Sequence, residues 1–121
     1  MNNKTSKVII ADNLKCILLL ENIWSEWELP GGHVNKKESY INCAKRETFE
    51  ETKIRLVNIE RVKILDKCTI FYSSVRKKLN VRLSSEHTSF RWVEFKDINS
   101  MKISRKTRDY IDTIYNVIEN Y

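Results

Sequence analysis

Apolar and polar residues alternate in blocks along this chain, and the blocks predict an order of strands and helices. Two short apolar segments, residues 8–11 and 16–20, flank the polar pair at 12–13, which predicts a β-hairpin at the start of the fold. Pro30, Gly31 and Gly32 are consecutive, and they are the only prolines and glycines in the sequence. Because glycine adopts backbone conformations closed to other residues, a sharp turn of special geometry is expected there.

The rest of the chain carries two helical patterns separated by β-rich segments. Residues 38–52 lack proline and glycine, and Ile41, Ala44 and Thr48 recur at spacings of three and four, as on one face of a helix. Segments rich in β-branched and aromatic residues predict strands at 56–65, 68–75, 79–83 and 90–95. A second amphipathic helix is expected over residues 104–120, with Ser104 as its N-cap. Its apolar face is formed by Tyr110, Ile111, Ile114, Tyr115, Val117 and Ile118.

This order of elements predicts an α+β fold in which a mixed β-sheet is sandwiched between helices. No repeat or linker divides the 121 residues, so a single domain over residues 1–121 is expected. The longest apolar stretch is far shorter than the roughly 20 residues of a membrane-spanning helix. The polar N-terminus, residues 1–7, lacks the features of a secretory signal, so we expect a cytoplasmic protein with no membrane partner.

Cysteine usage and charge narrow the chemistry only slightly. Cys16, Cys43 and Cys68 are widely spaced and form no Cys-x-x-Cys pair, so we expect buried thiols and neither a disulfide framework nor a zinc site. The net charge of +6 favours phosphate-bearing partners, although a solvated basic surface explains it equally well.

The strongest chemical pattern is a set of carboxylates on the predicted helix at 38–52. Glu47, Glu50 and Glu51 stand at i, i+3 and i+4, so they project from one face. Like charges at this spacing repel by roughly 0.2–0.5 kcal/mol, which folding alone does not favour and which a hard cation such as Mg²⁺ would relieve. An exposed acidic face, with Arg46 paired to Glu50, is the structural alternative. The two glycines ahead of the helix favour a metal site, because they allow close approach of a phosphate and leave a carbonyl free for the ion.

The spacing of these residues resembles the Nudix box. Gly32 is followed after five residues by Glu38, and after seven more by Arg46-Glu47, two further residues and Glu50-Glu51. Segments 27–32 and 86–92 also resemble this family, so the resemblance spans most of the chain and implies a Nudix fold.

Two positions depart from the family pattern. Thr48 stands where the family has a bulky aliphatic residue, and Lys53 stands where it has a glycine. Thr48 would bury less apolar area, and Lys53 would adopt a left-handed conformation at the end of the helix. Both departures concern stability more than catalysis.

The resemblance implies a role for each box residue. Glu50 and Glu51, with the carbonyl of Gly31, would hold Mg²⁺, with Mn²⁺ as an alternative ion, and Glu47 would bind a metal or orient water. Arg46 would position the glutamates. Glu86 would act from an opposing loop as a ligand or a base, while its neighbour His87 is expected to be structural.

Substrate contacts are expected from the glycine turn and from aromatic side chains. Gly32 would approach the phosphates, and Trp27 and Phe71 are the first candidates for contact with a base. The chain offers further aromatic residues for such a wall, although aromatic residues in strands are more often core. They are Trp24, Tyr40, Tyr72 and Phe90.

The implied activity is hydrolysis of a phosphoanhydride bond in a nucleoside diphosphate linked to another group. For so small a chain we expect a (deoxy)nucleoside triphosphate pyrophosphohydrolase of MutT type, which releases a nucleoside monophosphate and pyrophosphate. Removal of pyrophosphate from RNA 5′ ends is an alternative, because the basic runs at 76–78 and 105–108 offer contacts for a phosphate backbone. A catalytically silent nucleotide-binding module is a third interpretation, against which the intact glutamate set argues. The sequence leaves the base, the sugar, the number of metal ions and the oligomeric state open.

Overall fold

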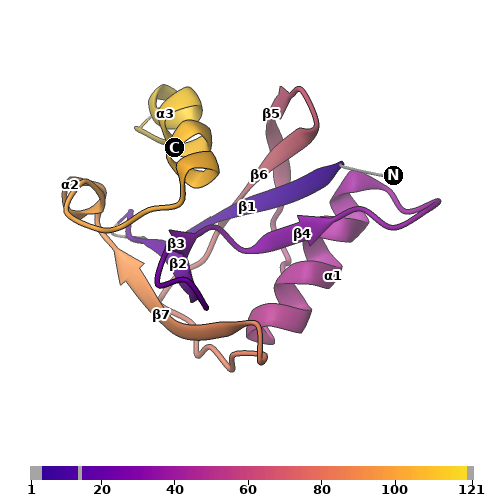
Figure 1. Ribbon diagram of the computed structural model, residues 1–121. Helices are drawn as coiled ribbons and strands as arrows, with labels where there is room; N and C mark the ends of the chain where they lie inside the picture. Colours follow the sequence, from indigo (N-terminus) through magenta and orange to yellow (C-terminus); the bar gives the residue numbers. More distant parts are fainter. Residues whose placement is uncertain (1–3, 14, 120–121) are drawn as a thin grey trace.

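The computed structural model describes residues 4–13 and 15–119, and it has the expected α+β architecture (Figure 1). The elements follow one another as β1 (Thr5–Ala11), β2 (Ile17–Asn22), β3 (Trp27–Glu28), β4 (Gly31–His33), α1 (Tyr40–Thr52), β5 (Glu60–Leu65), β6 (Cys68–Ser74), β7 (His87–Val93), α2 (Phe95–Ile98) and α3 (Arg105–Glu119).

Strand β1 is the centre of the mixed sheet. It pairs in parallel with β6 along its whole length, and β5 continues the sheet beyond β6. The other edge of β1 is shared between two antiparallel partners. Its first half pairs with β4, where Lys7 lies opposite Gly31, and its last residue, Ala11, pairs with Ile17 of β2. Strand β2 then leaves β1 and pairs with β3 and β7. In the expected hairpin, β1 and β2 are therefore paired only through Ala11 and Ile17 among the described residues.

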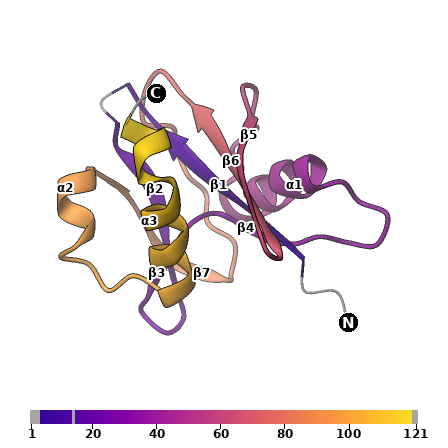
Figure 2. The same cartoon turned by 90° about the horizontal axis from the view of Figure 1, so that it is seen from above.

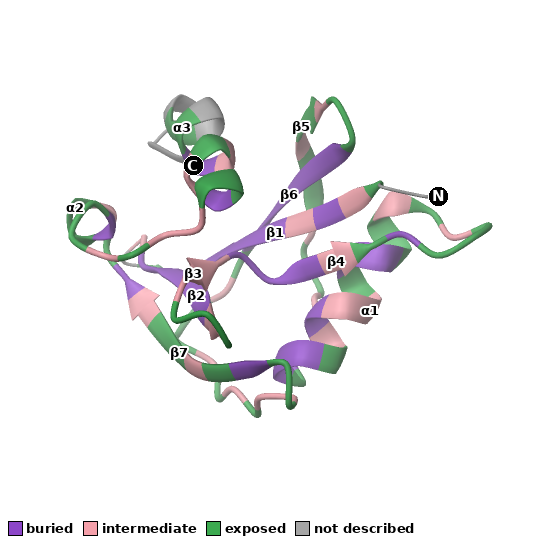
Figure 3. Cartoon of the chain, viewed as in Figure 1, coloured by how far each residue is buried: buried purple, intermediate pink, exposed green. Residues whose placement is uncertain are grey.

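Helices α1 and α3 lie on opposite faces of the sheet (Figures 1 and 2). Alternate side chains of β1 serve the two faces, as a strand that is buried on both sides requires. Val8 and Ile10 pack in the cluster that includes Ala44 of α1, whereas Ile9 and Ala11 pack in the cluster that includes Ile111 of α3. The buried strands form a continuous band between the helices (Figure 3). The expected sandwich of a mixed sheet between helices is confirmed.

The two predicted helices are present, with small differences at their ends and faces. Helix α1 begins at Tyr40 and not at residue 38, and Ile41 is 37% exposed, so it lies outside the buried face. Helix α3 begins at Arg105, and the backbone N–H of Thr107 donates to Ser104 Oγ at 3.3 Å, as expected of an N-cap. The side chains of Ile114, Val117 and Ile118, and all of Asn120, lie outside the described residues.

The strand predicted at 79–83 is wrong, because this segment forms no ladder with another strand in the described part of the chain. Leu79, Val81 and Leu83 nevertheless pack against the cluster on the α1 face, which explains their apolar character. The strand predicted at 56–65 starts only at Glu60, and the one predicted at 90–95 runs instead from His87 to Val93.

Two further expectations concern burial. Cys16, Cys43 and Cys68 are free and buried, as expected. Among the described residues, no helix is long and apolar enough to cross a membrane.

Candidate active site

Helix α1 has well-defined caps at both ends, which fix its acidic face. The backbone N–H of Asn42 donates to Ser39 Oγ at 3.1 Å, so Ser39 is the N-cap. Lys53 at the other end is left-handed, with φ of 64°, and its N–H donates to Phe49 O at 2.8 Å. Lys53 therefore adopts the left-handed conformation that was expected at this position, where the family has glycine.

The two glycines allow strand β4 to lie directly against β1 and α1. Gly31 has φ of 137°, and a Cβ atom there would collide with the backbone oxygen of Ser6. A Cβ atom on Gly32 would lie 2.5 Å from the carboxyl group of Glu47. The position of Gly31 therefore requires glycine for its conformation and for the close approach of β1, whereas a side chain at Gly32 would displace the Glu47 carboxylate.

Arg46 joins the loop after β4 to the acidic face of α1. Its guanidinium donates to both carboxylate oxygens of Glu38, at 2.7 and 3.1 Å, and to the backbone oxygen of His33 at 3.0 Å. The same group donates to Glu47 at 3.0 Å and to Glu50 at 2.8 Å. These bonds lower the pKa of Glu38 and raise that of Arg46, so this ion pair stays charged.

Glu51 is the most buried carboxylate of the acidic face, with an exposed fraction of 4%. Its Oε1 atom accepts the backbone N–H of Gly31 at 2.9 Å. Burial raises the pKa of Glu51 to about 7, and the bond from Gly31 and the charge of Lys7 offset only part of this effect. A buried carboxylate of this kind needs a cation if it is to stay ionised near neutral pH.

Glu86 is brought to Glu51 by the segment that precedes β7. The backbone N–H groups of Arg82 and Ser84 donate to the carbonyls of Thr52 and Glu51 at 3.0 and 3.3 Å, so the segment is tied to the last turn of α1. The last carbonyls of a helix have no partner within it, and here the N–H groups of this segment supply one. The segment therefore places Glu86 opposite the acidic face.

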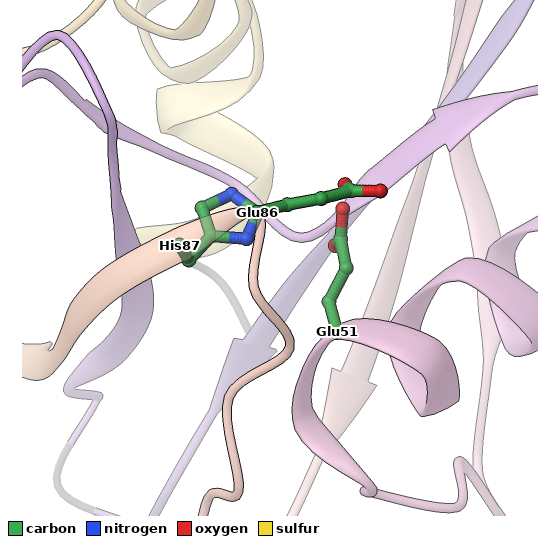
Figure 4. A group of neighbouring side chains, drawn as sticks. All are labelled: Glu51, Glu86 and His87. Carbon is green, nitrogen blue, oxygen red and sulfur yellow. The ribbon is translucent and has the colours of Figure 1, made fainter.

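Glu51, Glu86 and His87 form one cluster. Each offers a ligand atom, and these atoms all lie within 4.8 Å of one another. Figure 4 shows the carboxylates of Glu51 and Glu86 turned toward each other, with the His87 ring beside Glu86. Glu51 and Glu86 of this cluster line a cavity of about 690 Å³, which Glu47, Gly31 and Gly32 also line.

The donor set fits a divalent cation. Two carboxylates meet at the cluster, one of them buried, and a third, Glu47, lines the same cavity. Carboxylate oxygens are the ligands that Mg²⁺ and Mn²⁺ prefer. The carbonyl of Gly31, expected as a further ligand, accepts a long hydrogen bond from Lys7 Nζ at 3.5 Å, and the same ammonium donates to Leu29 O at 3.2 Å.

The model of the NUDIX domain matches residues 2–114. This chain belongs to the NUDIX family. An RNA pyrophosphohydrolase from Pelagibacter ubique (strain HTCC1062) is 38% identical over 64 residues, 53% of this chain and 35% of that protein. An asymmetrical bis(5′-nucleosyl)-tetraphosphatase from Caenorhabditis elegans is 36% identical over 86 residues, 59% of this chain and 60% of that protein. This NUDIX chain therefore matches about one third and three fifths of the length of these relatives.

A solved structure gives the same result for the fold. The MutT protein from Methanosarcina mazei Go1 superposes with a TM-score of 0.73 at 25% identity, over 93% of this NUDIX chain and 91% of that chain. The agreement extends over nearly the whole sequence, including the strands and helix that form the cluster.

Two of the expected substrate contacts are not supported. Phe71 is 3% exposed and packs in the core on the α1 face, and Trp27 packs against the cluster on the α3 face. Neither residue lines the cavity. Phe71 is buried in a strand covered by α1, and Trp27 is partly buried against the cluster on the α3 face, so both rings contribute to packing.

The structure brings to the cavity one of the further aromatic candidates, Trp24, and two residues that the sequence did not single out, Lys7 and Glu28. Trp24, which is 70% exposed in the turn between β2 and β3, lines it, and so do Lys7 and Glu28. Of the two basic runs, Arg105 and Lys106 at the start of α3 line the cavity, whereas residues 76–78 do not. Glu50 is 55% exposed at its side chain and is paired with Arg46, at the solvent side of the acidic face.

Proposed function

We propose that this chain is a hydrolase that needs a divalent cation and cleaves a phosphoanhydride bond in a nucleotide-linked substrate. The substrate class we infer is a nucleoside triphosphate, with a nucleoside monophosphate and pyrophosphate as products. The observation that carries the proposal is the cluster of Glu51 and Glu86 at a cavity that also has basic and aromatic walls.

Glu51 and Glu86 would hold the ion, Mg²⁺ or Mn²⁺, together with the carbonyl of Gly31 and with Glu50 on the solvent side. The ion, when bound, supplies positive charge that screens the phosphates and stabilises the leaving group. Glu47 faces the same cavity and would orient the attacking water. Arg46 would hold Glu47 and Glu50 in place through the bonds described above.

The opposite wall of the cavity suits the remainder of a nucleotide. Lys7, Arg105 and Lys106 carry positive charge toward it, which favours phosphate oxygens. Trp24 presents an exposed ring at the same opening, where a base would find an aromatic surface. One cavity therefore offers both positive charge for the phosphates and an aromatic ring for the base.

The test is product analysis with three substrates: a nucleoside triphosphate, a dinucleoside tetraphosphate and an RNA with a 5′-triphosphate. Each is incubated with the full chain and Mg²⁺, with EDTA as the control. We expect nucleoside monophosphate and pyrophosphate from the first substrate, at a higher kcat/KM than cleavage of the other two. Binding of all three without product formation would favour a catalytically silent nucleotide-binding module instead.

A second candidate is removal of pyrophosphate from RNA 5′ ends. It is supported by Arg105 and Lys106 at the cavity and by the relative from Pelagibacter ubique, which is named an RNA pyrophosphohydrolase. Neutralising Arg105 and Lys106 together would then lower the rate on RNA much more than the rate on a free nucleotide, because more phosphates are contacted in RNA. Equal losses on both substrates would count against this candidate.

A further inference from the structure

His87 is buried beside the carboxylates of Glu51 and Glu86, although no pattern in the sequence assigns it a chemical role. It is the first residue of β7, and its side chain has an exposed fraction of 3%. Figure 4 shows its ring near the start of the Glu86 side chain, with Glu51 projecting from α1 toward the Glu86 carboxylate. A ring nitrogen and one oxygen from each glutamate lie within 4.8 Å of one another.

The two ring nitrogens of His87 have different surroundings. Nε2 lies 2.8 Å from Oε2 of Glu28 on β3, and the other oxygen of Glu28 accepts a bond from Asn22 at 3.3 Å. Nδ1 is buried and has no hydrogen-bond partner among the residues that the structure describes. A buried polar atom without a partner costs about 1–3 kcal/mol, so the folded protein carries this cost unless something fills the position.

The bond to Glu28 determines which nitrogen of the neutral ring carries the proton. A carboxylate is an acceptor, so Nε2 is the N–H donor and Nδ1 keeps a free lone pair. A histidine that binds a metal almost always donates its other N–H to a carboxylate or carbonyl in this way. The carboxylate of Glu28 thus holds one nitrogen of the His87 ring, and the other nitrogen is left for an ion held by Glu51 and Glu86.

The dimensions are also suitable for an ion. Ligand atoms on opposite sides of an ion with bonds of 2.0–2.1 Å are about 4.2 Å apart. The observed spread of up to 4.8 Å needs to close by only about half an ångström for all three atoms to reach one ion. Glu86 is exposed, so its side chain can make this adjustment without repacking the core.

We propose that His87 Nδ1 is a ligand of the divalent ion in this site, and that Glu28 positions the ring. This inference rests on the proposed function, because it adds a nitrogen to the carboxylates already assigned. An imidazole ligand favours transition-metal ions over Mg²⁺, which strongly prefers oxygen. The site is therefore expected to select Mn²⁺ or Co²⁺ over Mg²⁺ more strongly than carboxylates alone would.

The direct test is pulsed electron paramagnetic resonance of the Mn²⁺-loaded full chain, prepared with ¹⁵N-labelled histidine. We expect a ¹⁵N coupling of the size that a directly bound imidazole gives. His33 is the other histidine of the chain, so the His33→Gln variant is the matched control and should keep the coupling. Bound Mn²⁺ without this coupling in the wild-type protein, or a coupling lost in His33→Gln, would overturn the assignment.

The His87→Gln variant adds an affinity measurement. The glutamine amide nitrogen can replace Nε2 in the bond to Glu28, while nothing replaces Nδ1. Calorimetric titration should show Mn²⁺ affinity reduced about 10- to 100-fold, with a smaller loss for Mg²⁺. If the ratio of Mn²⁺ affinity to Mg²⁺ affinity is unchanged in this variant, the assignment of His87 as a ligand is contradicted, but the proposed function is not. Failure of the wild-type protein to bind either ion would instead contradict the proposed function.

Discussion

Glu50 and Glu51 are neighbours in sequence, but they have opposite surroundings. Glu50 is about half exposed and paired with Arg46, whereas Glu51 is buried and bonded only to the N–H of Gly31. The exposed carboxylate is stable without an ion, because solvent and a guanidinium balance its charge. The buried one is not, and its raised pKa expresses this directly. Burial therefore makes the ionised form of Glu51 depend on a bound ion more strongly than that of Glu50.

The raised pKa of Glu51 predicts a pH-dependent stability in the metal-free protein. The pKa rises from 4.5 in the unfolded chain to about 7 in the folded one, so the folded state binds the proton more tightly. The resulting stabilisation is complete below pH 4.5 and is lost as pH rises through 7, a change of up to about 3 kcal/mol. Glu51→Gln stays neutral at every pH. In EDTA, urea midpoints should show the variant gaining on the wild-type protein between about pH 4.5 and pH 8.

This prediction has a matched control in Glu50→Gln, since Glu50 lies next to Glu51 but is half exposed. A gain of the same size for Glu50→Gln would show that burial of Glu51 is not the cause. So would a Glu51→Gln difference that does not change with pH.

The residues that the sequence could and could not assign differ in one physical respect. Glu47, Glu51 and the glycines are fixed by spacing along one helix and one turn, and the structure brings them to one cavity. Lys7 and Glu28 reach that cavity on strands β1 and β3, and His87 reaches Glu51 and Glu86 because β7 pairs with β2, with Asn22 opposite His87. No periodicity within a segment contains that information. Phe71 was expected to contact a base, but it is buried in the core, and the sequence pattern does not distinguish these two positions.

At the scale of secondary structure, α1 combines a buried apolar side with an acidic side, and the chain departs from the family pattern on the buried side and at the C-terminal end of the helix. Thr48 is fully buried on the side that faces the core, and its hydroxyl has no hydrogen-bond partner among the described residues. Lys53 ends the helix in a left-handed conformation. Both departures cost stability without touching an ion ligand.

Thr48→Val is expected to stabilise the protein by about 1 kcal/mol. Valine has the shape and β-branching of threonine, so packing and helix propensity hardly change, while a buried unpaired hydroxyl is removed. Denaturant unfolding at constant slope measures the difference. Thr52→Val is the matched control and should destabilise, because the Thr52 hydroxyl donates to Thr48 O at 2.6 Å and accepts from Ile54 N at 3.1 Å. Stabilisation by both changes, or loss by both, would show that the unpaired hydroxyl is not what matters.

The end of α1 provides a second prediction. Lys53→Gly removes the steric cost of a side chain at φ of 64°, but it also removes the contact of Lys53 Nζ with the Phe49 ring, 5.1 Å from its centroid. Lys53→Ala loses the same contact and keeps the steric cost. The glycine variant should therefore be more stable than the alanine variant by about 1 kcal/mol, and slightly more stable than the wild-type protein. Equal midpoints for the two variants would mean that the left-handed residue carries no strain.

The predicted secondary structure was correct where the pattern was local. The helices at α1 and α3 follow from apolar spacing and caps, and β6 follows from its continuous apolar run. The segment at 79–83 has the composition of a strand, but its backbone bonds to the end of α1 instead of to the sheet. The apolar composition predicts that these side chains are buried. It does not predict which backbone groups will form hydrogen bonds with the backbone of this segment.

At the scale of the whole molecule, the site lies where three parts of the fold meet: the edge of β1, the acidic face of α1 and the start of α3. Strands β4 and β2 share one edge of β1 and then diverge, so Lys7 and Gly31 lie at the cavity. An ion bound here would join α1 to the segment before β7 through Glu51 and Glu86. Ion binding at this site would therefore be coupled to the stability of the fold.

We expect Mg²⁺ and Mn²⁺ to raise the melting temperature, because the carboxylates are gathered only in the folded state. The gain in free energy follows RT ln(1 + [L]/Kd), about 2.7 kcal/mol at a hundredfold excess over Kd. Thermal unfolding with and without millimolar ion measures it, with Ca²⁺-free buffer and EDTA as the reference. Glu51→Gln should lose most of the shift, and an equal shift in that variant would place the stabilising ion elsewhere.

The most direct test of the account is turnover of a nucleoside triphosphate by the wild-type chain and by Glu51→Gln and Glu50→Gln, each with Mg²⁺ or Mn²⁺ and with EDTA. The predicted result is release of nucleoside monophosphate and pyrophosphate only when an ion is present. Both variants should lose most of that turnover while remaining folded, with the larger loss for the buried Glu51. Turnover that persists in EDTA, or near-wild-type rates in Glu51→Gln, would contradict the assignment of this cluster as the catalytic ion site.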